Sequence, residues 1–237
     1  MCGRYTLFSE PEAIDAFFDL EEAVDLPSNQ NDDLFGAPPI LHPLPSYNIS
    51  PSHVVPIILG GHTDHYPTRI RTAMHWGFMG WKPKGNERPF LPINTRSEQI
   101  LAKPMWRNAS HQRCLVPMNG FYEWSGIKGH KIPHYIHSST DDLLVAAGLY
   151  SPISPISGFA SFSILTTRPN RIMEPIHHRM PVFLHTSEWN NWLDHTRPLQ
   201  ELSYLMDPYP DAALSEYTVG TSVGNVRNNS PDLILPS

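Results

Sequence analysis

Proline is the residue that most restricts how this chain can fold. The sequence holds 25 prolines among 237 residues. Because proline lacks a backbone N–H and has a fixed φ, it interrupts long helices and central strands. The sequence therefore favours short strands joined by many ordered connections over a helical bundle. Apolar residues make up 40% of the chain, which is enough for a buried core, and the length favours a single domain over residues 1–237.

Local patterns predict more strands than helices. Ser9 and Glu12 have the spacing of an N-terminal capping box, and apolar residues follow on one face, which predicts a helix over 10–24. Residues 27–46 are rich in Pro, Asn and Asp and are predicted to form a long loop. Further helices are expected over 97–103 and 187–194. Short β-type runs occur at 53–59, 70–76, 113–118, 133–137, 143–149 and 159–166.

This order of elements indicates the α+β class. The connections between the strands are too short for repeated βαβ crossovers, so a mainly antiparallel sheet is expected. We expect this sheet to be a distorted, β-barrel-like one with a few flanking helices. No internal repeat or low-complexity linker divides the chain.

Missing patterns exclude several classes of protein. The longest apolar run, Leu143 to Leu149, is far shorter than the roughly 20 residues of a membrane span. The first residues also do not resemble a secretory signal, so we expect an intracellular protein that does not contact a membrane. The chain has no phosphate-binding loop, dinucleotide-binding turn, nucleophile elbow or HExxH motif. No cofactor is expected.

A metal site is not expected either. The chain has two cysteines, which are too few for a disulfide framework or a four-thiolate zinc site. His62 and His65 lie in a glycine-rich turn without a further cluster of ligands in sequence. His177 and His178 are adjacent. Because adjacent side chains of a strand point to opposite faces, the two histidines could not both bind one metal ion there.

The net charge of −6 hides a strongly uneven distribution of charge. Residues 69–131 hold eleven basic and three acidic residues, whereas residues 1–68 hold one basic and ten acidic residues. Residues 132–237 hold five basic and ten acidic residues. Because local fields govern the binding of polyanions, the central basic segment is a candidate nucleic-acid surface. The alternative is a solvated basic face without a ligand.

Cys2 is the most unusual potential nucleophile of the chain. Cys114 lies in an apolar run typical of a small buried side chain, but the second residue of a chain is rarely part of a core. If Met1 is removed, Cys2 carries a thiol with a reference pKa of about 8.5 beside an α-amine of about 7.7–8.0. Such a 1,2-aminothiol condenses with an aldehyde to an imine, and the thiolate closes a five-membered thiazolidine. This chemistry needs an acid/base carboxylate, a histidine and groups that orient the electrophile.

Eight short motifs occur in one order along the chain. They are Cys2-Gly-Arg-Tyr, Tyr47-Asn-Ile-Ser-Pro51, His75-Trp-Gly, Ile93-Asn-Thr-Arg96-Ser-Glu, Arg113-Cys-Leu-Val-Pro, Gly120-Phe-Tyr-Glu123-Trp, Ile176-His177-His-Arg-Met-Pro181 and Val223-Gly-Asn-Val-Arg-Asn. Together they resemble the SOS response-associated peptidase (SRAP) family, whose members shield abasic sites in single-stranded DNA by covalent cross-linking. The resemblance covers residue 2 to about residue 235. The family's fold, a single α+β domain around a distorted β-barrel, agrees with the expected strands.

The resemblance implies roles for the catalytic residues. Cys2 matches the residue that forms the cross-link, and Asn94 matches the asparagine beside the sugar-binding site. Glu123 matches the glutamate associated with removal of Met1 and with acid/base steps. His177 matches the catalytic histidine.

The resemblance also implies a DNA partner. Arg4 and Arg96 match arginines that contact phosphates, Trp76 resembles a residue of the DNA-binding groove, and Asn48 is expected to bind DNA. The expected partner is single-stranded DNA with abasic sites, bound by a monomer in DNA repair and the DNA damage response. Such a protein would work in the cytoplasm or nucleoid of a bacterium, or in the nucleus of a eukaryote.

Each of these residues also has a structural interpretation. Glu123 could be an outward-facing strand residue, Asn94 a turn residue and His177 an ordinary buried histidine. Arg96 and Arg107 could be surface charges. Tryptophans could belong to the core, although tryptophans interleaved with basic residues are also typical of a groove that stacks bases. These residues are Trp76, Trp81 and Trp106 with Arg69, Arg71, Lys82, Lys84 and Arg88.

Two other functions stay open. A thiol peptidase acting on other proteins would use Cys2 with His177 and would turn over peptides. A non-covalent single-stranded DNA binder would use the basic segment and would tolerate Cys2→Ser. The chain also departs from the family pattern in a long insertion at about 29–46 and in His178, where other members often carry Asp. The second departure bears on how His177 is oriented.

Overall fold

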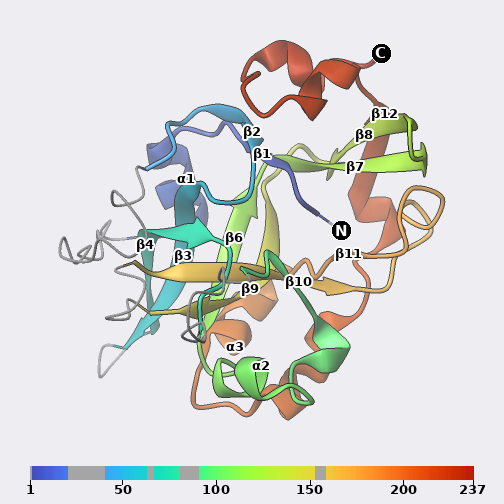
Figure 1. The fold of residues 1–237 in the computed structure, drawn as a ribbon. Helices are drawn as coiled ribbons and strands as arrows, with labels where there is room; N and C mark the ends of the chain where they lie inside the picture. The colour runs from blue at the N-terminus through green and yellow to red at the C-terminus, as the bar shows by residue number, and fades with distance from the viewer. Residues whose placement is uncertain (1, 21–40, 63–66, 81–90, 153–158) are drawn as a thin grey trace, which may run out of the picture.

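Two sheets of short strands form the framework of the molecule, as expected from the proline content (Figure 1). A computed structural model describes residues 2–20, 41–62, 67–80, 91–152 and 159–237. Within these residues the chain forms one α+β domain whose strand pairs are mostly antiparallel. The expected fold class is therefore confirmed.

The N-terminal strand, β1, is an interior strand of the first sheet. The strand order of this sheet is β12-β8-β7-β1-β2, so β1 is paired on both sides, with Tyr5 opposite Phe121 of β7 and Ile49 of β2. The strands are β1 (Tyr5–Leu7), β2 (Ser46–Ile49), β7 (Gly120–Ile127), β8 (His130–Ser138) and β12 (Leu214–Thr218).

The second sheet curls back on itself. Its order is β11-β10-β4-β3-β6-β9, and β9 pairs with β10 as well, which closes the path without making a regular barrel. Strand β10 is the irregular element, because it runs parallel to β4 at Phe162 and then parallel to β5 from Ile164. The strands are β3 (Val54–His62), β4 (Pro67–Trp76), β5 (Asn94–Arg96), β6 (Arg113–Met118), β9 (Leu144–Ser151), β10 (Ser161–Thr167) and β11 (Met180–Pro181).

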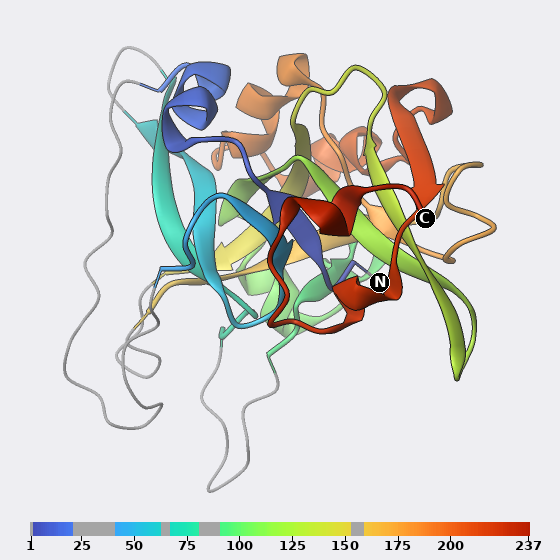
Figure 2. The ribbon, with the colours of Figure 1, turned by 90° about the horizontal axis from the view of Figure 1, so that it is seen from above.

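The two faces of the first sheet have different neighbours. Phe121 and Ile136 point into the main core, which lies between this sheet and the second one. Tyr122 and Tyr135 point the other way and pack against the C-terminal segment, residues 219–237, through Val223 and other apolar side chains. Figure 2 shows this segment, in red, curving around the start of the chain.

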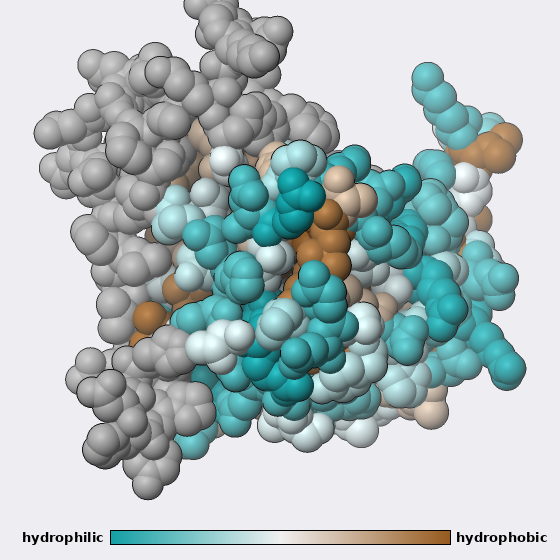
Figure 3. Space-filling view, turned by 90° about the horizontal axis from the view of Figure 1, so that it is seen from below, coloured by the Kyte–Doolittle hydropathy of each residue, from teal (hydrophilic) through white to brown (hydrophobic). Residues whose placement is uncertain are grey.

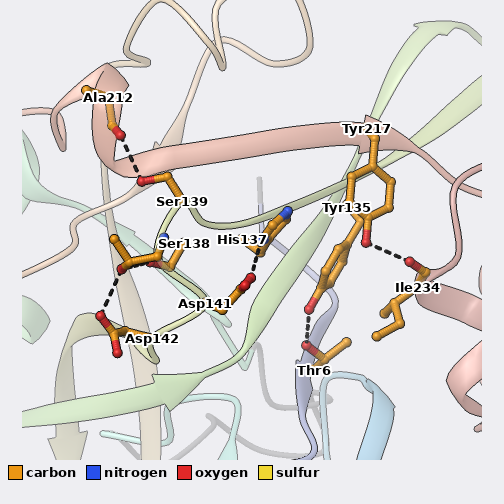
Figure 4. A network of polar contacts seen from close by, with 11 residues as sticks. Thr6, Tyr135, His137, Ser138, Ser139, Asp141, Asp142, Ala212, Tyr217 and Ile234 are labelled. Atoms are coloured by element: carbon orange, nitrogen blue, oxygen red, sulfur yellow. Dashed lines mark hydrogen bonds and ion pairs between the residues drawn. The ribbon is translucent and has the colours of Figure 1, made fainter.

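Polar contacts tie the C-terminal end of the chain to this outer face (Figure 4). The Tyr217 hydroxyl donates to the Ile234 carbonyl at 2.7 Å, and the Tyr135 and Thr6 hydroxyls are 2.9 Å apart. The outer face of the first sheet is thus covered by residues that follow β12.

The α-helices of the described residues are shorter than expected. The α-helices are α1 (Pro11–Phe18), α2 (Pro104–Asn108) and α3 (Trp189–Leu193). Single turns or short runs of 3₁₀-helix occupy Ser97–Gln99, Thr186–Glu188, Leu199–Met206, Asp211–Ala213, Thr221–Gly224 and Pro231–Ile234.

Two of the helix predictions need correction. The helix expected over 10–24 ends at Phe18, because Asp19 adopts a left-handed conformation and its N–H caps the last turn, and residues 21–24 lie outside the described residues. The expected capping box is absent as well, since Ser9 accepts a hydrogen bond from Asn119 instead. The helix expected over 97–103 is only the 3₁₀ turn at Ser97–Gln99, whereas the one expected over 187–194 is confirmed by the turn at 186–188 and α3.

All six expected strands are present, with ends shifted by up to three residues. The sequence did not predict β1, β2, β5, β7, β11 or β12. The long loop expected over 27–46 ends where β2 begins at Ser46, and residues 27–40 lie outside the described residues.

No helix among the described residues is long and apolar enough to span a membrane. The face of the molecule in Figure 3 is mostly hydrophilic, with hydrophobic residues gathered in a narrow strip near its middle.

Candidate active site at Cys2

Cys2 lies in the main core, three residues before β1, so the expectation that the second residue is not part of the core is wrong. Its side chain is only 1% exposed, because the strand that follows it is enclosed by β2 and β7. Burial raises the pKa of the Cys2 thiol to about 12, and the negative charge of Glu123 acts in the same direction. The thiol is therefore protonated at neutral pH, and Glu123 is close enough to act on it electrostatically.

Asn94 anchors the backbone of Cys2. This residue begins β5, where its pairing with Ile164 of β10 fixes the backbone. The Asn94 side-chain Nδ2 donates to the Cys2 carbonyl at 2.8 Å. Among the described residues, the buried Oδ1 of Asn94 has no hydrogen-bond partner. An unpaired buried acceptor is costly, so this oxygen is suited to accept a hydrogen bond from a ligand.

Glu123 is a buried carboxylate in β7. It is 4% exposed and follows Tyr122, whose N–H donates to the Arg4 carbonyl next to β1. This pairing brings Glu123 beside the start of the chain. Glu123 therefore does not face outward, so the alternative interpretation of Glu123 as an outward-facing strand residue is wrong.

His177 lies close enough to interact electrostatically with Glu123. Burial lowers the pKa of His177, and the negative charge of Glu123 opposes this shift. His177 Nδ1 lies 3.0 Å from the Arg179 backbone nitrogen and 3.2 Å from the Arg179 carbonyl oxygen, so the backbone of Arg179 holds this side of the ring. His178 stacks on the ring with 4.3 Å between the centroids, and so contributes to its orientation.

An ion pair that the sequence analysis missed supports the His177 turn. Arg179 makes two hydrogen bonds to Glu98, at 2.6 and 2.9 Å, and the Arg179 side chain is only 10% exposed. Both residues lie within motifs that carry the family resemblance, but charge and spacing alone did not show that they pair. Their contact links the segment after β5 to the one before β11.

Arg4 and Asn48 are bonded to each other and to the C-terminal segment. Arg4 Nη1 donates to Asn48 Oδ1 and to the Val223 carbonyl, both at 2.7 Å. The Asn48 amide in turn donates to the Asn228 carbonyl at 2.7 Å, and Asn48 is buried. These bonds hold the C-terminal segment in place. A DNA contact by either side chain stays a prediction.

Trp76 and Arg96 differ sharply in exposure. Trp76 is fully buried, its Nε1 donates to the Ile93 carbonyl at 3.0 Å, and its ring packs on Tyr5. Trp76 therefore belongs to the core, as in the structural interpretation of this residue. No face of its ring is open to a base. Arg96, at the end of β5, is exposed.

The other residues of the expected basic groove are only partly described. Trp106 is buried and packs on Phe78. Arg71 forms an ion pair with Asp15 at 2.6 Å. Trp81, Lys82, Lys84 and Arg88 lie outside the described residues, as does His65. Within the described part of the chain, no three His, Cys, Asp or Glu side chains form a group that could hold a metal ion.

Comparisons with other sequences place this site in a family. Residues 1–226 match the protein family described as SOS response associated peptidase (SRAP). The chain is 33% identical over 240 residues to the abasic site processing protein YoqW of Bacillus subtilis (strain 168), and the match covers 99% of both chains. It is 29% identical over 221 residues to the abasic site processing protein HMCES of Xenopus tropicalis, covering 79% of this chain and 65% of that protein.

Solved structures have the same fold. A protein from Bacteroides thetaiotaomicron aligns over 100% of both chains with a TM-score of 0.77 at 22% identity. A phage-related protein from Bordetella bronchiseptica aligns over 92% of this chain and 94% of its own, with a TM-score of 0.63 at 27% identity. Together with the match over residues 1–226, these comparisons show that the chain belongs to the SOS response associated peptidase (SRAP) family.

Proposed function

We propose that this protein processes abasic sites in single-stranded DNA by forming a covalent thiazolidine cross-link through Cys2 after Met1 has been removed. One observation carries the proposal, which is the convergence of Asn94, Glu123 and His177 on Cys2. These residues come from β5, β7 and the turn before β11, so their grouping depends on the whole fold. The names of the relatives, abasic site processing proteins, support the same class of substrate.

The chemistry of the cross-link balances without an oxidant or a cofactor. The Cys2 amine attacks the aldehyde carbon of the ring-opened sugar, and loss of one water gives an imine. The sulfur then adds to the imine carbon, and the thiol proton ends on the nitrogen. A thiol with a pKa of about 12 enters this step protonated, and so supplies that proton itself.

The neighbouring residues have separate roles in these steps. Glu123 carries the proton between sulfur and nitrogen, as a general base and then a general acid. His177 donates a proton from Nε2 to the ring oxygen when the sugar opens to the aldehyde. Asn94 Oδ1 accepts a hydrogen bond from a sugar hydroxyl.

Intact mass spectrometry tests this proposal. The purified protein is incubated with a single-stranded oligonucleotide that contains one abasic site. The expected product has the mass of the protein without Met1 plus the oligonucleotide minus one water. Cys2→Ala should lose this stable product. Cys114→Ala is the matched control and should retain it, because Cys114 is buried in β6. A normal yield of stable product from Cys2→Ala would place the bond elsewhere.

The same variants distinguish the cross-link from a thiol peptidase. A peptidase would turn over unstructured peptides in a reaction that requires Cys2 and His177. Such turnover without any DNA adduct would overturn the cross-linking proposal in favour of the peptidase. Binding of single-stranded DNA by Cys2→Ser with no adduct from the unaltered protein would favour a non-covalent binder.

A further inference from the structure

Three polar side chains outside the Cys2 site form a chain of two short hydrogen bonds. Ser125 Oγ lies 2.8 Å from His134 Nε2, and His134 Nδ1 lies 2.9 Å from Glu216 Oε2. Because an ionised carboxylate only accepts hydrogen bonds, the imidazole proton is on Nδ1. Nε2 is then the acceptor for the Ser125 hydroxyl proton. A nucleophile, a base and a carboxylate that orients the base are thus connected in the order that serine hydrolases use.

The register of the first sheet explains why these residues meet. His134 of β8 lies opposite Glu123 of β7 and opposite Thr218 of β12. Since side chains alternate between faces, Ser125 and Glu216, each two residues along its strand, share the face of His134. The three side chains therefore come from three adjacent strands.

In this group the base, His134, has a mostly buried side chain, and the nucleophile, Ser125, is partly exposed. On the same face, Ile136 is fully buried in the main core, so the face passes from the core to solvent along the strands. The His134 side chain is 14% exposed. Ser125 is half-buried, and the next residue, Gly126, is exposed. Ser125 is thus partly exposed, while the protein shields most of the His134 imidazole.

We propose that Ser125 is an activated nucleophile that accepts acyl groups from small carboxylic esters. Ser125 Oγ attacks the ester carbonyl carbon while its proton passes to His134 Nε2. The bond to the leaving alcohol breaks, and the same proton passes to the leaving oxygen. Water then hydrolyses the acyl-serine with His134 again as the base, which restores the free hydroxyl. Glu216 keeps Nε2 directed at Oγ throughout.

This reactivity is separate from the proposed cross-link. It uses neither Cys2 nor Asn94 nor His177, and its nucleophile is a hydroxyl rather than an aminothiol. The two sites share strand β7, in which Glu123 and Ser125 point to the same side.

A fluorophosphonate probe tests the proposal, because it phosphonylates activated serines with loss of fluoride. Intact mass and peptide mapping should show one adduct, at Ser125, and Ser125→Ala should abolish it. His134→Gln should slow labelling by about 100-fold or more, the effect expected for loss of a general base. Glu216→Gln should also slow it. The exposed position of Glu216 makes that variant the safer one for folding, and thermal unfolding midpoints verify both.

The controls distinguish activation of the Ser125 hydroxyl by His134 from the simple exposure of a serine side chain. Ser139 is an exposed serine whose hydroxyl donates to the Ala212 carbonyl at 2.8 Å (Figure 4), and Ser139→Ala should leave labelling unchanged. Cys2→Ala should still be labelled at Ser125, and Ser125→Ala should still form the DNA adduct. With 4-nitrophenyl acetate, the unaltered protein should release 4-nitrophenol faster than Ser125→Ala does. No adduct on Ser125 in the unaltered protein, or equal labelling rates with and without His134, would overturn the proposal.

Discussion

Glu123 acts on Cys2 in two ways that a single substitution separates. Its charge helps to raise the pKa of the buried thiol, and the proposed chemistry also uses it to move protons. In Glu123→Gln the charge is lost, so the pKa of Cys2 should fall below about 12, towards its ordinary value. Adduct formation should nevertheless slow by about 10²–10⁴-fold, because a general acid/base is missing.

Two measurements verify this prediction. The pH dependence of thiol alkylation, followed by mass spectrometry, reports the pKa of Cys2. The rate of adduct formation on the abasic oligonucleotide reports proton transfer. Retention of Met1 is scored first, because Glu123→Gln should also impair its removal if that step is autocatalytic. A Met1-free variant that reacts at the normal rate would exclude Glu123 from the proton transfers.

The sequence predicted which residues lie together better than it predicted how exposed they are. Cys2, Asn94, Glu123 and His177 lie in short motifs that a sequence displays directly, and the structure brings them together. Whether Trp76 is open to a base depends on β10, which lies beside the end of β4. A pattern within one strand does not show which distant strand will pair with it, so this burial was not predictable.

At the scale of elements, Arg113 connects β6 to α3 and to the segment that follows α3. Its fully buried guanidinium donates to four backbone carbonyls, those of Ser110, Trp192, Asp194 and Arg197. Arg113→Met should leave these acceptors without their donor, and the free energy of unfolding should fall by about 3 kcal/mol or more. Denaturant unfolding measures the change. The exposed Arg107→Met is the control and should stay within about 0.5 kcal/mol of the unaltered protein.

The contact between His42, which precedes β2, and His53, which lies between β2 and β3, should make the fold sensitive to acid. His42 stacks on His53 with 3.9 Å between the ring centroids, and burial, with His53 acting in the same direction, lowers the pKa of His42 to about 4. An unfolded chain protonates His42 near its ordinary pKa of about 6.5. As the pH falls through 6.5, the unfolded state therefore gains protons first and stability falls, until His42 also protonates in the folded state near pH 4.

His42→Gln isolates this contribution. The difference in the free energy of unfolding between variant and unaltered protein, measured from pH 7 to pH 4, should shift in favour of the variant as the pH falls. The amide can still reach the Ser46 hydroxyl that His42 Nε2 contacts at 2.8 Å. A difference that does not vary with pH would show that His42 is not shifted in the folded state.

The elements themselves were predicted where the pattern is continuous and missed where it is interrupted. Strand β6, in which Arg113 is followed by five apolar residues, was predicted with its observed ends. Strand β1 has only three residues, and β12 alternates imperfectly, so neither gives a periodic signal. Strand β1 is stabilised instead by a partner strand on each side, and β12 by its single partner, β8.

At the scale of the whole molecule, the charge pattern predicts how DNA binding depends on salt. Arg96 is exposed at the end of β5, two residues after Asn94, whose side chain donates a hydrogen bond to the Cys2 carbonyl. If Arg96 contacts one phosphate, Arg96→Ala should reduce the slope of log affinity against log salt by about 0.7 on single-stranded DNA. Fluorescence anisotropy with an undamaged oligonucleotide at several salt concentrations measures the slope. An unchanged slope would remove Arg96 from the DNA contact.

The hydrogen bonds from Arg4 and Asn48 to the backbone at residues 223–228 have a consequence for biosynthesis. A ribosome makes Arg4 and Asn48 long before it makes these acceptors. While the chain grows, its leading end emerges without the carbonyls that fix the positions of Arg4 and Asn48. We therefore expect Cys2 to acquire its finished surroundings only after residues 223–228 have been made. A nascent chain that lacks these residues would present Cys2 without the environment that the proposed cross-link requires.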